Sequence, residues 1–193
     1  YWISSSVDSK KGNTTTWTIT NTHKPGVKSY TVNKVWDDDN NRDGKRPVSV
    51  EMKLVAKAGE NTVKEYPVTL TSDNKVPNTN TNTWTYTWND LPEKYNAQDL
   101  TYSISEVYVT YAVGIKVSVN TTKEQAEQSS NNPYYSTNKK DNETTWTFTN
   151  HYTPETTTVS VNKTWDTKGD TNAVIPSSVK FTLKAKQGNA NGK

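Results

Sequence analysis

Apolar and polar residues alternate in several short stretches of the chain, as they do in β-strands that bury one face. The clearest stretch runs from Tyr30 to Trp36, where Tyr30, Val32 and Trp36 share a face with Lys34. Three of these four side chains are apolar or aromatic, so this face is predicted to point into the core. The pattern therefore predicts an inward-facing lysine. A buried, isolated ammonium is unfavourable, so this lysine must find a partner or lose its proton.

Two further stretches place a polar side chain on a face that should be buried. Glu106 belongs to the alternating segment 102–108, and Asn150 to the segment 146–150. The apolar residues in phase with them are Tyr102, Ile104, Tyr108, Trp146 and Phe148. A polar residue on the otherwise apolar inward face of a strand breaks the expected pattern, and such exceptions usually mark a functional site. Lys34, Glu106 and Asn150 are therefore the candidate site residues.

The chain also contains an internal repeat. Residues 13–21 match residues 142–150, and residues 32–37 match residues 161–166. Both matches have the same offset of 129 positions (21 to 150, 34 to 163). A repeat of this length indicates an array of similar domains.

The repeat predicts three segments. Residues 29–153 form one complete domain, residues 1–22 the C-terminal end of a preceding repeat, and residues 159–193 the N-terminal part of a following one. Asn21 is equivalent to the inward asparagine and Lys163 to the inward lysine, but each lacks its partners within the chain. Neighbouring domains are expected to stack as a semi-rigid rod, because the junctions between them are short.

Composition favours an all-β domain. Only 30% of the 193 residues are hydrophobic, but the chain has 7 Trp and 11 Tyr, and large aromatic side chains can supply core area. About seven strands with frequent turns, including a polar turn at 72–83, predict an immunoglobulin-like β-sandwich. One helical turn is expected near residues 124–128, inside a long polar insertion at 120–142.

Charge and cysteine content exclude several classes of protein. The net charge is +3 and no basic stripe is present, so nothing supports nucleic-acid binding. No apolar run is long enough to span a membrane. The chain has no cysteine, so in a secreted protein any covalent reinforcement must be something other than a disulfide.

Several motifs together resemble the B-type repeats of Gram-positive surface proteins, the Cna-B-like domains of collagen-adhesin stalks and pilins. The resemblance covers essentially the whole chain and rests on residues 32–38, 40–47, 84–92, 102–106 and 148–150. It implies a reversed-immunoglobulin sandwich that carries a spontaneous isopeptide bond. Lys34 would supply the amine, Asn150 the amide and Glu106 the assisting acid. Such a domain is its own single-turnover substrate, is not an enzyme, and needs no cofactor or metal.

The alternation alone leaves two interpretations of this trio open. The first is a cross-link, which requires a neutral lysine, a polarised amide and close contact between them. The second is an unreactive buried Lys34–Glu106 ion pair, with Asn150 as a hydrogen-bonding partner. The motif match favours the cross-link.

Other candidate sites are weaker. The Asp39-x-Asn41-x-Asp43-Gly44 run resembles the start of a calcium loop, but the bidentate glutamate is missing at the twelfth position. The aromatic residues of segment 84–88 could stack on a sugar, although their shared phase favours the core. The two histidines, His23 and His151, are not equivalent in the repeat, and no Ser-His-acid constellation is visible.

We expect the chain to be a structural stalk domain of an extracellular, cell-wall-anchored adhesin, with its anchor outside this segment. Its neighbours would be other repeats of the same protein, and the full-length adhesin would contact a host extracellular protein or glycan. The alternative is a ligand-binding module that uses the 120–142 insertion or the aromatic strand. A pilin subunit that cross-links to other chains would need a further reactive lysine, which the sequence does not identify.

Overall fold

The computed structural model describes residues 2–75 and 82–186. The chain divides into two compact units, residues 1–155 and residues 156–193, which are considered separately. Positions 76–81 of the expected polar turn lie outside the described residues.

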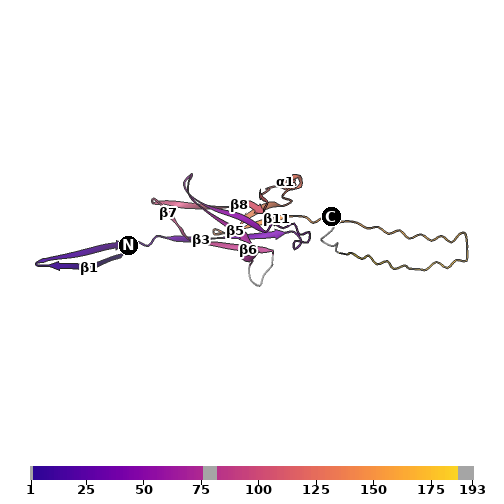
Figure 1. The fold of residues 1–193 in the computed structure, drawn as a ribbon, viewed down its shortest axis with the longest axis horizontal. Coiled ribbons are helices and arrows are strands. Elements are labelled where there is room, and N and C mark those ends of the chain that lie inside the picture. The colour runs from indigo at the N-terminus through magenta and orange to yellow at the C-terminus, as the bar shows by residue number, and fades with distance from the viewer. Residues whose placement is uncertain (1, 76–81, 187–193) are drawn as a thin grey trace. The chain divides into compact units, whose positions relative to one another are not determined.

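The elements of the first unit are almost all strands (Figure 1). In the described residues they are β1 (Trp2–Lys11), β2 (Thr14–Thr22), β3 (Val27–Asp37), β4 (Ser49–Ala58), β5 (Asn61–Thr71), β6 (Thr83–Pro92), β7 (Lys94–Tyr95), β8 (Gln98–Thr110), β9 (Lys116–Ser118), β10 (Tyr135–Lys140) and β11 (Thr145–His151). A single 3-10 turn (Ser72–Asn74) follows β5, and one short helix, α1 (Lys123–Gln128), precedes β10. Nothing helical in the described part of the chain has the length and apolar character needed to cross a membrane.

Strands β3–β11 form two sheets that enclose a large hydrophobic core and a smaller cluster of Ala56, Ala58 and Leu100. One sheet has the order β10-β11-β3-β6 and the other the order β5-β4-β8-β7, with β9 added to β8. Strand β11 runs parallel to β3, and the other pairings are antiparallel. This arrangement confirms the predicted all-β, immunoglobulin-like sandwich.

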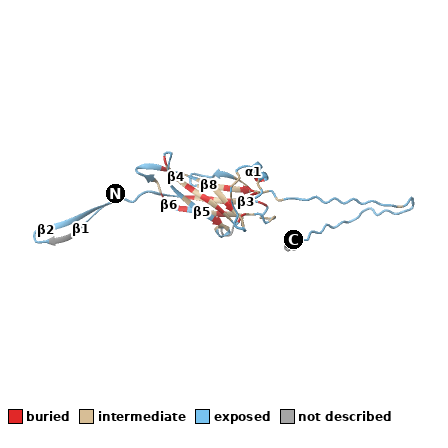
Figure 2. Ribbon diagram, turned by 45° about the horizontal axis from the view of Figure 1, so that its top comes forward, coloured by how far each residue is buried: buried red, intermediate tan, exposed pale blue. Residues whose placement is uncertain are grey.

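The alternation in the sequence explains which faces are buried. In β4, Val50, Met52, Leu54 and Ala56 are completely buried, whereas the residues between them are partly exposed. Figure 2 shows the buried positions gathered on the strands of the sandwich. Each fully buried aliphatic side chain contributes about 1.5–3 kcal/mol of transfer free energy, so this periodicity fixes the register of the sheet.

The predicted phase of segment 102–108 is wrong at its C-terminal end. Glu106 lies opposite the buried Met52, but the register then shifts and leaves Val107 as the extra residue of a β-bulge. Beyond the bulge, Val109 is buried and Tyr108 is not. A bulge reverses the alternation, which a strict two-residue period cannot anticipate. Glu106 precedes the bulge and keeps its inward phase.

The 120–142 insertion contains more structure than its composition indicated. The expected helical turn is confirmed as α1, with Thr122 as its N-cap. Residues 135–140 form β10, an edge strand that pairs with β11 and that the sequence pattern did not reveal. Tyr134, just before β10, is 1% exposed and belongs to the core. The insertion is therefore an integral part of the sandwich.

The segments that precede and follow the sandwich in the chain are built differently from it. Residues 2–22 form a two-stranded antiparallel hairpin, β1–β2. Its apolar side chains are exposed, among them Trp17 at 60% and Ile19 at 68%. The described part of the second unit, residues 156–186, contains turns but no helix or strand.

Candidate isopeptide site

Lys34 is buried in the centre of β3 with 0% exposure, as the alternation predicted. Its Nζ donates a hydrogen bond to the carbonyl of Val35 at 2.9 Å and lies 3.5 Å from the carbonyl of Phe148. The same nitrogen lies 4.3 Å from the centroid of the Trp36 ring. The amine is thus surrounded by backbone carbonyls and an aromatic face.

Burial lowers the pKa of Lys34 from 10.5 to about 8, because the charged form loses its hydration in the core. Glu106 acts in the opposite direction by stabilising the ammonium, Arg46 lowers the pKa further, and Asp38 raises it. With a pKa near 8, roughly a tenth of the lysine is neutral at pH 7. A neutral amine is the form that can act as a nucleophile.

Asn150 lies on β11, directly beside the lysine strand, and is 1% exposed. The parallel register pairs Phe148 with Lys34 and Asn150 with Trp36. Lys34 and Asn150 are therefore two positions out of register and share the buried face of the sheet. Diagonal neighbours on one face are within reach of a long side chain.

Glu106 approaches Asn150 from the facing sheet and is partly buried. Asn150 Nδ2 donates a hydrogen bond to Glu106 Oε1 at 2.8 Å, and Ser136 Oγ donates one to Glu106 Oε2 at 2.6 Å. Asn150 Oδ1 is buried without a hydrogen-bond partner. A protonated Glu106 could donate to this oxygen if the amide group were rotated by half a turn, and the orientation of an amide is assigned from its contacts. The structure therefore places Glu106 against the Asn150 amide and Lys34 on the adjacent strand of the same buried face, where its pKa responds to the charge of Glu106.

A second buried polar cluster lies beside this site. Asp38 is 1% exposed and accepts hydrogen bonds from both Nε and Nη2 of Arg46. Tyr134 also donates to it, at 3.0 Å. These contacts hold the pKa of Asp38 below its usual value although burial alone would raise it. Arg46 lies 5.5 Å from the centroid of the Trp36 ring, so this cluster and Lys34 contact the same indole.

Sequence reasoning missed Ser136 and the role of Asp38, for different reasons. Asp38 continues the phase of Lys34 and Trp36, so the alternation could have identified it as an inward-facing residue. Ser136 lies in the polar run 135–140, where no apolar alternation marks a strand. Its position became visible only through the pairing of β10 with β11.

In the acidic loop after β3, the side-chain oxygens of Asp39, Asn41 and Asp43 form hydrogen bonds or ion pairs with other residues of the chain. Asp39 pairs with Arg42 at 3.1 Å, and Asn41 Oδ1 accepts a hydrogen bond from the backbone of Arg46. Asp43 accepts hydrogen bonds from the Tyr152 hydroxyl and from the backbone of residue 155. No cluster of three or more His, Cys, Asp or Glu side chains suited to a metal occurs among the described residues. The calcium-like spacing is therefore explained by turn and ion-pair contacts.

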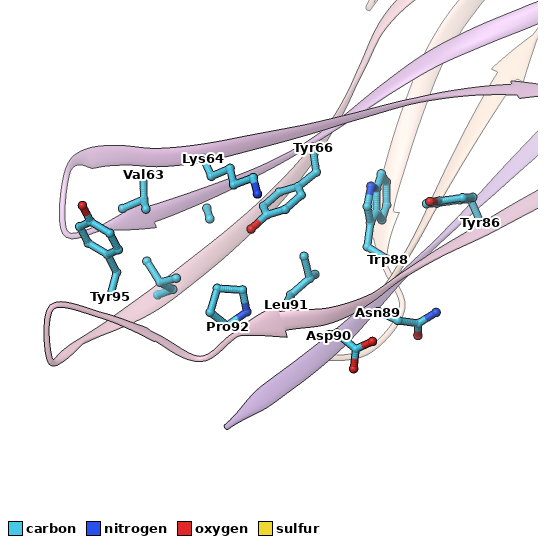
Figure 3. A pocket seen from close by; sticks show the side chains of 12 residues that line it. Val63, Lys64, Tyr66, Tyr86, Trp88, Asn89, Asp90, Leu91, Pro92 and Tyr95 are labelled. Carbon is cyan, nitrogen blue, oxygen red and sulfur yellow. The ribbon is translucent and has the colours of Figure 1, made fainter. Parts of the chain in front are cut away.

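The aromatic strand β6 contributes mainly to the core. Trp84 and Trp88 are 2% and 6% exposed, while Tyr86 is partly exposed. A cavity of about 480 Å³ lies beside Trp88, and Tyr66 and Tyr95 also line it (Figure 3). The side chains of Asn89 and Asp90 point away from the aromatic rings in this view. Lys64 is the polar side chain that faces these rings, with its Nζ 4.8 Å from the centroid of Tyr66.

His151 takes part in a chain of hydrogen bonds on the outer face of the sheet. Its Nε2 lies 2.9 Å from Thr137 Oγ1, and its Nδ1 lies 2.8 Å from Asp37 Oδ2. The order hydroxyl–imidazole–carboxylate resembles a catalytic triad, with threonine in place of serine. Asp37 is 69% exposed, so the group lies on an open surface, and we interpret it as a cross-strand contact between β10, β11 and β3.

The repeat equivalents of the site residues have different surroundings. Asn21 and Lys163 are both exposed. Lys163 Nζ lies 3.8 Å from the centroid of Trp165, the equivalent of Trp36. Neither residue has a buried environment comparable with that of Lys34 or Asn150.

Fold and site together define a β-sandwich domain with a buried lysine, a buried asparagine and a partly buried glutamate. The family profile of the Cna protein B-type domain matches residues 30–129. The chain is also 34% identical over 168 residues to the collagen adhesin of Staphylococcus aureus, which covers 87% of this chain. The chain therefore belongs to the Cna protein B-type domain family. It spans 12% of the length of that collagen adhesin.

Two crystal structures of B repeats of the collagen-binding protein Cna of Staphylococcus aureus are similar to this chain. The two-repeat unit is 26% identical and covers 76% of this chain and 35% of its own, with a TM-score of 0.45. The single repeat is 25% identical and covers 76% and 70%, with a TM-score of 0.43. The fold described above does not depend on these likenesses.

Proposed function

We propose that residues 29–153 form a stalk domain of a bacterial surface adhesin, stabilised by an autocatalytic isopeptide bond between Lys34 and Asn150. Glu106 would act as the assisting acid. The observation that carries this proposal is the meeting of a buried, readily neutralised amine, a buried amide on the adjacent strand, and a carboxyl group hydrogen-bonded to that amide.

The reaction would be an amide exchange. The neutral Lys34 amine attacks Asn150 Cγ, while protonated Glu106 donates to Oδ1 and stabilises the developing negative charge. Glu106 then carries a proton from the lysine nitrogen to the leaving amide nitrogen. One C–N bond forms, one C–N bond breaks, and ammonia leaves. Contact in the folded core supplies an effective molarity of roughly 10⁵–10⁸ M, so folding itself would trigger the reaction.

The contacts of Lys34 argue against an unreactive ion pair. Such a pair needs its opposite charges in contact. None of the ion pairs found within 4.0 Å among the described residues includes Lys34, whose Nζ hydrogen-bonds carbonyl oxygens instead. Glu106 uses its two oxygens for Asn150 and Ser136. This arrangement leaves the carboxyl group directed at the amide, as the cross-linking reaction requires.

A bond at this place suits a domain that transmits tension. The chain enters the domain at the start of β3 and leaves it at the end of β11, and these two strands are adjacent and parallel. A Lys34–Asn150 bond would carry load directly from one strand to the other. Residues 35–149 would then be shielded from extension. This is the mechanical basis of the proposed stalk role.

We also propose that residues 1–22 and 159–193 belong to further copies of the repeat. Their exposed apolar residues support this. Trp17 and Trp165 are 60% and 45% exposed, whereas the equivalent Trp146 and Trp36 are 8% and 2% exposed. Such side chains would be buried only with the rest of a sandwich around them, since an isolated hairpin is marginally stable at best.

Similarity to a collagen adhesin supports an extracellular, cell-wall location for the longer protein, with a host extracellular protein or glycan as its partner. The repeat would then act as a spacer rather than as the binding module. Incorporation of the 120–142 insertion into the sandwich fits this role better than the alternative of a ligand-binding loop.

Intact-mass measurement tests the cross-link. The purified chain should weigh one ammonia less than its sequence, and Lys34→Ala and Glu106→Ala should restore the full mass. Lys53→Ala, which changes a lysine on the outer face of β4, should still lose ammonia. Peptide mapping should recover a branched peptide that joins residues 34 and 150. An unmodified mass for the folded wild-type chain would overturn the proposal.

A further inference from the structure

Ser136 is the cross-strand neighbour of Asn150 in the β10–β11 pair. Its Oγ lies 2.6 Å from Glu106 Oε2, while Asn150 Nδ2 lies 2.8 Å from Glu106 Oε1. Two adjacent side chains of one sheet therefore hold the two oxygens of a carboxyl group that comes from the other sheet. Each oxygen has its own partner, so the plane of the carboxyl group is fixed.

The backbone around Ser136 is itself held in place. Its N–H donates to the carbonyl of Asn120 at 2.8 Å. The side-chain amide of Asn120 in turn donates to the carbonyls of Asn132 and Tyr134 at 2.8 and 2.9 Å. Asn120 thereby fixes the entry into β10, and Tyr134 anchors that entry in the core. The Ser136 hydroxyl is consequently presented from a constrained segment, although β10 is an edge strand.

We propose that Ser136 is a positioning residue for the isopeptide reaction, an inference that rests on the proposed function. The reaction needs one oxygen of Glu106 to face the Asn150 amide throughout. A hydroxyl group can donate to a carboxylate or accept from a carboxylic acid, so Ser136 can retain the second oxygen in both protonation states. No step requires Ser136 to exchange a proton with the reacting atoms.

A neighbouring cavity explains why this anchor is needed. A space of about 190 Å³ borders Glu106 and Ser136, and Val119, Thr121 and Asn138 also line it. Asn150 does not line this cavity. A space of this size whose lining includes Glu106, Thr121 and Asn138 accommodates water, which would compete for Glu106 if the hydroxyl of Ser136 were removed. Ser136 would thus keep the carboxyl group turned towards the amide rather than towards solvent.

The experiment follows cross-linking in the full chain. Protein recovered unfolded and uncross-linked is refolded by dilution, folding is followed by tryptophan fluorescence, and ammonia loss is followed by intact mass over time. The informative pair is Ser136→Thr and Ser136→Val, which have nearly the same shape and differ in the hydroxyl. Ser136→Ala removes the hydroxyl without adding bulk. Asn138→Ala is the control, since it changes the same face of β10 and the same cavity but makes no hydrogen bond to Glu106.

Ser136→Val and Ser136→Ala should fold like the wild type and lose ammonia about tenfold more slowly, the effect of one hydrogen bond to a carboxyl group. Ser136→Thr and Asn138→Ala should react at close to the wild-type rate. The rate of ammonia loss should rise with pH as Lys34 is deprotonated, and the pH of this rise should be the same in every variant. Equal rates for Ser136→Thr and Ser136→Val, or a shift in that pH dependence, would overturn the role of Ser136. A wild-type chain that never loses ammonia would instead overturn the proposed function itself.

Discussion

Lys34 and Asn150 lie on neighbouring parallel strands, two positions out of register, so their side chains share the buried face of one sheet. Parallel strands that are adjacent in space can be far apart in sequence. Here they are the first and last strands of the sandwich. A bond between these two residues would therefore close nearly the whole domain into one covalent loop, and most of its physical consequences follow from that closure.

Loss of the cross-link should lower the stability of the domain substantially. Glu106→Gln preserves shape and polarity but removes the acid, so the chain should fold without reacting. A cross-link that closes a loop of ~100 residues stabilises by about 5 kcal/mol on the chain-entropy model. Urea denaturation should therefore show a free energy of unfolding lower by about this amount in Glu106→Gln. Equal stability of a fully cross-linked wild type and an uncross-linked variant would contradict this expectation.

The pKa of Lys34 predicts an unusual pH dependence in a chain that cannot cross-link. In Asn150→Ala the lysine stays free, and burial lowers its folded-state pKa to about 8 from 10.5. Between these two values the unfolded chain binds more protons than the folded one, so stability should rise with pH. Below about pH 8 both states are protonated, and the full desolvation penalty of the ammonium remains. Between about pH 8 and pH 10.5 the free energy of unfolding of Asn150→Ala should increase by roughly 3 kcal/mol.

The matched control for this measurement is the double variant Asn150→Ala with Lys34→Met. Methionine fills a similar volume but does not titrate, so its stability should lack this rise. Comparison of the two variants at each pH subtracts the titration of the tyrosines, which is common to both. If the free energies of unfolding of the two variants changed with pH in parallel, Lys34 would have an ordinary pKa in the folded state.

The Asp38–Arg46 pair should behave as a unit. Under the offset of 129 positions, Asp38 corresponds to Thr167 and Arg46 to Ile175, so both charges are absent together from the equivalent positions. Removal of one partner leaves a buried charge unpaired, which typically costs about 3–5 kcal/mol. We expect Asp38→Thr and Arg46→Ile each to destabilise strongly. The double variant should lose less than the sum of the two, because neither charge is left alone.

A double-mutant cycle by urea denaturation measures this coupling, with mass measurement to confirm that cross-linking is unchanged in each variant. Purely additive losses would mean that the two charges act independently. In the Asn150→Ala background, where Lys34 keeps a free amine, removal of Arg46 should raise the pKa of Lys34 and removal of Asp38 should lower it. Removal of both should change that pKa less than removal of either one.

Alternation was enough to find Lys34, Glu106 and Asn150, because each interrupts an apolar face that the period of two defines. It could not find Ser136, whose strand has no apolar face to interrupt. It also misplaced Tyr108, since a bulge at Val107 reverses the phase and depends on the pairing with β4. Local pattern thus identified the residues that oppose burial, while contacts between strands determined which groups surround them.

Mechanical pulling should distinguish the cross-linked chain from the free one most directly. If load passes from β3 through Lys34 and Asn150 to the end of β11, residues 35–149 cannot extend in the wild type. In Glu106→Gln the same residues should unfold under force and release on the order of 400 Å of chain, from about 3.3–3.6 Å per residue. Single-molecule force spectroscopy with handles on the two ends measures this step. The hairpin and the C-terminal segment extend equally in both proteins, so they provide the internal control. A wild-type chain with confirmed ammonia loss that still released the full length would show that the bond does not join these two strands.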